Sequence, residues 1–192
     1  MRRAHRVYFD RTLQLLSQAT RRDPIMRIAY LDCLSGISGD MTLAALVDAG
    51  VPLAEVQAGL DSLGIAGLRL ETNEVKKKGF RALKLTIHHE PEHAHRHVHH
   101  ITEMIDRSSL TARQKERAAK IFEKLAAAEA KVHGSTIEKV HFHEVGAVDS
   151  IADIVGAAIG FDLLDIERVI CSPRLGRSVL CGSTPLSVVG VV

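Results

Sequence analysis

The sequence predicts an α/β fold, an α+β sandwich in which helices pack on a small mixed sheet and a long His-rich loop intervenes. Short apolar or alternating segments, typical of strands, interleave with longer helical segments along the 192 residues, a pattern that favours helices layered on a sheet. The hydrophobic content is 46%, which is enough for a core, and with 4% aromatic residues and no Trp that core is expected to be aliphatic.

The first predicted strand is the apolar run at residues 28–31, which is followed by a Ser/Gly turn. Either Ser38 or Asp40 can cap the next helix, which is predicted to continue to about Asp48. Gly50 then ends that helix. The first unit is therefore a strand, a turn and a helix.

A second helix and a hairpin come next. Pro52 suits the first turn of a helix, which is predicted to run to about Leu63. Apolar and polar residues alternate over residues 68–72, as in a half-buried strand. The lysine-rich segment 76–79 predicts the hairpin turn, and residues 82–87 predict the returning strand.

The second half of the chain is mainly helical. A short helix is predicted over residues 101–105, and a long one over residues 111–133, which its first residue, a threonine, can cap. Residues 140–143 are expected to be extended. Residues 151–164 are apolar nearly all round, which indicates a buried helix, and residues 168–171 form the last predicted strand.

Composition divides the chain into three parts and excludes several functions. Residues 1–25 form an Arg-rich appendage without the apolar core of a signal peptide, residues 26–175 form the main domain, and residues 176–192 form a divergent or truncated tail. The net charge is +2 without a basic stripe, so no nucleic-acid partner is expected, and no apolar run is long enough for a membrane span. Three cysteines without a CxxC motif indicate reduced thiols and a cytoplasmic location.

A histidine tract is the strongest chemical signal. Seven of the thirteen residues in the 88–100 loop are histidine. They are His88, His89, His93, His95, His97, His99 and His100. Clustered neutral imidazoles suit Zn, Cu, Fe and Ni, so the tract predicts a metal-handling loop. The alternative is a solvated linker that binds metal incidentally.

The Ser/Gly turn after the first strand is the second signal. Its candidate binding residues are Asp32, Ser35, Gly36, Ser38, Gly39 and Asp40. A turn that opens a helix directs free backbone N–H groups outward and can hold a phosphate, while the flanking carboxylates can hold a cation. No Gly-Lys-Ser/Thr follows, so this is not a Walker A motif. The alternative is a tight strand-to-helix connection with a capping Asp.

A third signal lies between the long helix and the buried helix. His141 and His143 project from the same face of an extended segment, and Glu144 follows at once. Asp149 and Asp153 are four apart on the next helix and share a face. We select His141, His143, Glu144 and Asp149 as candidate catalytic residues. Asp149 serving only as an N-cap, and Asp153 pairing with a cation, are the alternatives.

Taken together, these segments resemble a known family. Residues 30–41 and 141–150, with the His tract between them, are similar to the two signatures of the nickel-pincer-cofactor nickel insertion proteins. The resemblance covers about residues 26–171. It implies insertion of nickel into pyridinium-3,5-bisthiocarboxylic acid mononucleotide, which forms one carbon–nickel and two sulfur–nickel bonds in a cofactor for lactate racemase and related enzymes.

The resemblance also implies CTP dependence, with the nucleotide site in the C-terminal half of the family. We therefore expect this chain to be an N-terminal half, or a frameshifted or truncated product, of a nickel-inserting cyclometallase of the lyase or chelatase class. Its expected partners are Ni²⁺, the thiolated pyridinium mononucleotide, a C-terminal-half chain and further copies of itself. The alternative is a nickel or zinc storage protein or metallochaperone, which needs only the His tract.

Overall fold

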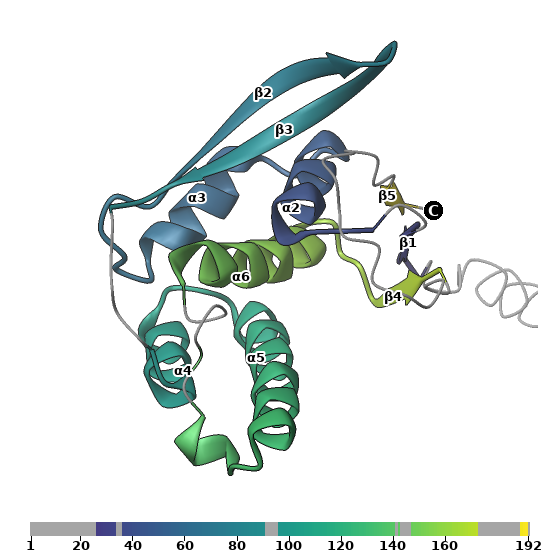
Figure 1. The fold of residues 1–192 in the computed structure, drawn as a ribbon. Helices are drawn as coiled ribbons and strands as arrows, with labels where there is room; N and C mark the ends of the chain where they lie inside the picture. Colours follow the sequence, from purple (N-terminus) through teal and green to yellow (C-terminus); the bar gives the residue numbers. More distant parts are fainter. Residues whose placement is uncertain are drawn as a thin grey trace, which may run out of the picture.

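The computed structural model describes residues 26–33, 36–90, 96–140, 142, 147–172 and 189–191. Within these ranges, helix α6 (Val148–Leu163) lies between two groups of elements (Figure 1). On one side are α2 (Gly39–Asp48), α3 (Leu53–Asp61) and a hairpin of β2 (Arg69–Lys77) and β3 (Phe80–His88). On the other side are α4 (Val98–Arg107) and α5 (Ala112–His133).

A three-stranded mixed sheet joins segments from opposite ends of the described chain. Its central strand β1 (Ile28–Leu31) is parallel to β4 (Arg168–Cys171) and antiparallel to β5 (Val189–Val191). In the parallel register Leu31 lies opposite Cys171. The predicted α/β class with a small mixed sheet is confirmed, and the hairpin forms a second, separate sheet.

Helix α6 supplies the centre of the core. Its residues Ile151, Ala152 and Val155 are fully buried, as its apolar sequence predicts. The long helix α5 packs against it with a buried face at every fourth residue: Ala118, Phe122, Ala126 and Ala130. Thr111 and Gln114 form a complete capping box at the start of α5. Among the described helices, none combines the length and the apolar character that crossing a membrane requires.

Helices α2 and α6 lie close together and run in the same direction. A Cβ atom built on Gly39 would lie 2.1 Å from the carboxylate of Asp153, and one built on Gly160 would lie 2.9 Å from Leu46. The first contact is near the N-terminal ends of both helices and the second is near their C-terminal ends, so the two helices are parallel. The N-terminal ends of α2 and α6 therefore meet.

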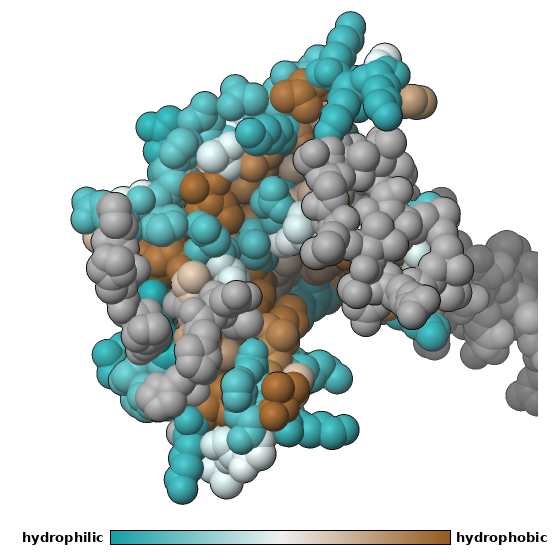
Figure 2. Space-filling view, viewed as in Figure 1, coloured by the Kyte–Doolittle hydropathy of each residue, from teal (hydrophilic) through white to brown (hydrophobic). Residues whose placement is uncertain are grey.

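The hairpin turn has the predicted position and chemistry. Lys78 (φ 49°) and Gly79 (φ 86°) both have positive φ angles, as a tight two-residue hairpin turn requires. Arg81 ties β3 to α2 through Asp48, with 2.7 Å between the guanidinium and the carboxylate. Hydrophilic side chains cover most of the hairpin on the face shown in Figure 2.

Two expectations about the middle of the chain were wrong. The His tract is not one loop, because His88 ends β3 and His99 and His100 lie inside α4. Helix α4 starts three residues earlier than the predicted helix. Ile101 and Ile105 are buried on one face of the helix, and this packing also stabilises the helical turn that precedes Ile101.

Helix α6 also begins earlier than predicted. Its N-cap is Ala147 and its first residue is Val148, which is 3% exposed. Asp149 is therefore in the first turn of the helix, and the alternative that it serves only as an N-cap is wrong. Burial of Val148 in the core accounts for the additional turn.

Candidate functional site

Three carboxylates and one imidazole gather where α2, α6 and the end of β3 meet. Asp40 lies in the first turn of α2, and Asp149 and Asp153 lie in the first two turns of α6. His89 follows the last residue of β3. We call Asp40, Asp149, Asp153 and His89 the acid–imidazole cluster. The parallel packing of α2 and α6 creates it by placing both N-terminal ends together.

Asp153 has a strongly raised pKa. Burial, followed by repulsion from Asp40 and then from Asp149, raises the pKa of Asp153 from 3.8 to about 7. Its Oδ1 atom is buried and has no hydrogen-bond partner within the described part of the chain. A carboxylate in this position is stabilised by a proton or by a cation. At neutral pH, Asp153 can therefore both accept and release a proton.

His89 is oriented by its other ring nitrogen. Its Nδ1 lies 2.8 Å from the backbone oxygen of Glu90. Because a carbonyl oxygen only accepts, Nδ1 carries the hydrogen and Nε2 faces the cluster. This Nε2 lies 3.1 Å from Asp149 Oδ1. Two ligands bound to one ion at about 2.0–2.2 Å stand roughly 2.9–3.4 Å apart, so the pair has the spacing of adjacent metal ligands as well as that of an ion pair.

The described part of the Ser/Gly turn leads directly into the cluster. Ser38 is the N-cap of α2, but its hydroxyl donates to the carboxylate of Asp40 and makes no bond to the helix backbone. Gly36 has a φ of +88°, which favours glycine. The group that approaches Gly39 closely is the side chain of Asp153.

Gly39→Ala should destabilise the protein by about 1–3 kcal/mol, because the added Cβ overlaps Asp153 and forces α2 away from α6. Without this overlap, alanine would stabilise the helix by up to about 1 kcal/mol. The sign of the change in the free energy of unfolding therefore shows whether α2 and α6 are in close contact at Gly39. Urea unfolding measures it. Ser38→Ala is the control and should change stability by less than about 0.5 kcal/mol, since Ser38 makes no backbone cap.

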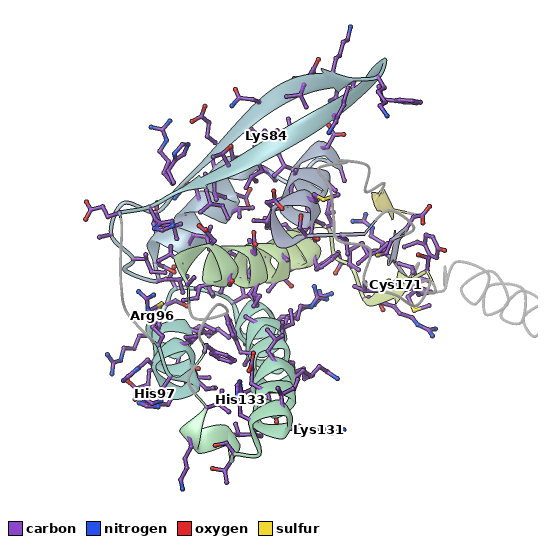
Figure 3. All side chains as sticks on the ribbon, viewed as in Figure 1. Lys84, Arg96, His97, Lys131, His133 and Cys171 are labelled. Atoms are coloured by element: carbon purple, nitrogen blue, oxygen red, sulfur yellow. The ribbon has the colours of Figure 1, made fainter. Side chains whose placement is uncertain are left out.

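The described histidines of the tract fall on different elements. His88 ends β3 and its Nε2 lies 3.0 Å from Glu71 Oε2. His97 is the N-cap of α4, where Figure 3 labels it, and its ring centroid lies 5.2 Å from that of His99 and 5.5 Å from that of His100. The last two centroids are 4.0 Å apart. Among the residues with described positions, no three His, Cys, Asp or Glu side chains form a ready-made metal site.

Several predicted site residues lie outside the described ranges: Ser35, His93, His95, His141, His143 and Glu144. Asp32, another predicted site residue, follows β1 and is half-buried. The charges that raise the pKa of Asp153 come from Asp40 and Asp149. Asp153 itself was not among the selected catalytic residues. Its signal was present in the sequence, as an acid one turn after Asp149 on an apolar helix.

Comparison with known proteins assigns a family. A family model described as nickel insertion protein matches residues 29–182. A putative nickel insertion protein from Rhodopirellula baltica is 57% identical over 144 residues, which cover 74% of this chain and 36% of that protein. No solved structure matches the chain.

Two further relatives carry a more specific name, pyridinium-3,5-bisthiocarboxylic acid mononucleotide nickel insertion protein. The protein from Geobacillus kaustophilus is 49% identical over 158 residues, which cover 77% of this chain and 38% of the relative. The protein from Desulfitobacterium hafniense strain DCB-2 is 51% identical over 148 residues, which cover 77% of this chain and 37% of the relative. The chain thus spans 36–38% of the length of these three relatives.

Proposed function

The chain belongs to the nickel insertion protein family, and from this premise we propose that it carries the nickel-handling part of an enzyme that metallates pyridinium-3,5-bisthiocarboxylic acid mononucleotide. The observation that supports this assignment is the acid–imidazole cluster, above all the half-buried carboxyl of Asp153 with a pKa of about 7. Nickel and the mononucleotide are substrates in this scheme. CTP would bind to the portion of the relatives that extends beyond this chain.

The chemistry requires a base. When nickel bonds to the ring carbon, the carbon–hydrogen bond breaks, its electron pair forms the carbon–nickel bond, and the proton must leave. A carboxylate with a pKa near neutrality suits this proton transfer, because it is substantially ionised before the step and can hold the proton afterwards. Asp153 fills this role in our proposal. Binding of nickel close by would favour ionised Asp153 by offsetting the repulsion from Asp40 and Asp149.

Nickel would be held by Asp149 and His89 while it waits for the ring. Their 3.1 Å separation is compatible with two ligands of one ion, and imidazole with carboxylate is a suitable donor set for nickel. Because His89 belongs to the His tract, it would pass nickel from the tract to the cluster. The remaining tract histidines would gather Ni²⁺ from solution.

The untested residues keep the roles that the sequence predicts. His141, His143 and Glu144 directly precede α6 in the chain, so we propose that they complete the nickel site or assist proton removal. Ser35, Gly36, Ser38 and Gly39 would hold the phosphate of the mononucleotide through donors of the turn, and Asp32 would hold a cation. Nickel bound at Asp149 would partly offset the repulsion between that phosphate and the nearby carboxylates.

His89→Ala tests the proposed nickel ligand, with His88→Ala as the matched control. Both changes are made in a variant whose His93, His95, His97, His99 and His100 are alanine, so that tract binding does not mask the cluster. We expect His89→Ala to weaken Ni²⁺ binding by about tenfold or more, a loss of about 1.4 kcal/mol or more, and His88→Ala to have little effect. Isothermal titration calorimetry measures both. Equal affinities would remove His89 from the site.

The metal-storage alternative has one observation in its favour, the group of imidazoles at the start of α4. A storage protein has no use for Asp153, however, because a half-buried carboxyl that is repelled by two neighbouring carboxylates adds no binding capacity. Nickel uptake that is unchanged in affinity and stoichiometry when Asp40, Asp149 and Asp153 are all changed to Asn would favour storage.

A further inference from the structure

Two cysteines meet at the carboxyl ends of the parallel strands. Cys33 follows β1 and Cys171 ends β4, and their Sγ atoms lie 3.3 Å apart although 138 positions separate them in the sequence. Cys33 is buried and Cys171 is exposed. The sequence pattern does not reveal this pair, because it has no CxxC spacing. The third cysteine, Cys181, lies outside the described residues.

The backbone around the two sulfurs is already fixed. Leu31 lies opposite Cys171 in the parallel register. The next residue, Ser172, donates its N–H to Leu31 O at 2.9 Å, and its hydroxyl accepts from the N–H of Cys33 at 2.8 Å. A disulfide needs an S–S distance of about 2.05 Å. Rotation of the two cysteine side chains can bring the Sγ atoms closer together without a change in strand register.

We propose that Cys33 and Cys171 form a reversible dithiol/disulfide site that exchanges with small-molecule disulfides of the glutathione class. The exposed Cys171 attacks as its thiolate, breaks the S–S bond of the small molecule and releases one thiolate. Cys33, also as a thiolate, then attacks the sulfur of Cys171 and releases the second. The protein loses two protons and two electrons, and the small disulfide gains them as two thiols.

The resulting bond would cross-link the two strands directly before the Ser/Gly turn. The closed loop would include almost the whole helical part of the molecule, so it would restrict the unfolded chain strongly. We therefore expect the oxidised form to melt about 5–15 °C higher than the reduced form.

The test exposes the whole chain to defined ratios of reduced and oxidised glutathione in the absence of oxygen and metal. Free thiols are then blocked with an alkylating reagent, and intact mass and peptide mapping identify the linkage. The variants are Cys33→Ser, Cys33→Ala, Cys171→Ser and Cys181→Ser. The exposed Cys171 tolerates change most readily, and two substitutions at the buried Cys33 guard against a folding defect in one of them.

We expect the wild type and Cys181→Ser to form a monomeric Cys33–Cys171 disulfide that dithiothreitol reverses. The Cys33 variants should stop at Cys171 carrying one glutathione, and in Cys171→Ser the buried Cys33 should stay reduced. Three free thiols in the wild type under oxidising ratios, or a linkage that includes Cys181, would overturn the proposal. So would protection of both thiols from alkylation only in a parallel sample that contains Zn²⁺, which would indicate a metal site instead.

Discussion

Changing Asp153 to Asn should reduce nickel insertion by about 100-fold to 10,000-fold, the range typical of removing a general base. Asn has nearly the same shape but cannot accept the proton that leaves the ring carbon. Because the chain spans about 38% of the Geobacillus relative, the assay combines the chain with the complementary C-terminal part of that relative, nickel, CTP and the thiolated mononucleotide. Mass spectrometry follows the nickelated product.

Asp48→Asn is the matched control, since it makes the same change on an exposed acid of α2 that pairs with Arg81. It should insert nickel at close to the wild-type rate. Normal insertion by Asp153→Asn would show that the raised pKa of Asp153 serves another purpose. A folded Asp153→Asn variant that binds nickel but fails to insert it would separate the proton step from metal binding.

The second large effect is on stability as a function of pH. Folded Asp153 keeps its proton up to about pH 7, whereas the unfolded carboxyl releases it near pH 3.8. Between these values the folded state binds more protons, so a rise in pH favours unfolding through this group. Asp153→Asn lacks this penalty and should become more stable than the wild type by about 2 kcal/mol above pH 7, which is about half of what this pKa shift corresponds to without solvent screening, because the carboxyl is partly exposed.

Urea unfolding of both proteins from pH 4 to pH 8 measures this difference. The stability that Asp153→Asn gains over the wild type should be near zero at pH 4, increase toward pH 7 and then level off. In an Asp40→Asn background, the stability gain from Asp153→Asn should level off at a lower pH and at a smaller value, since one of the two charges that repel ionised Asp153 has been removed. A difference that does not change with pH would contradict the assigned ionisation.

Much of the local structure follows from short segments of sequence. Thr111 and Gln114 cap α5 as a pair, and Gly134 ends that helix with a φ of +59°, because capping depends on groups within a few residues. The turn at Lys78 and Gly79 and the strands on either side follow from alternation and turn chemistry. The errors at the starts of α4 and α6 arose where burial against distant elements adds a turn that local composition does not favour.

The candidate site divides in the same way. The sequence by itself determined the family signatures, the metal-suited histidines and the pairing of Asp149 with Asp153 on one helical face, since each depends on residue type and short spacing. Only the tertiary structure decided that Asp40 approaches Asp153, that His89 faces Asp149, and that Cys33 lies beside Cys171. The physical reason is that burial and charge repulsion depend on which distant elements pack together, and here close contact at Gly39 and Gly160 brings the first turns of α2 and α6 to one place.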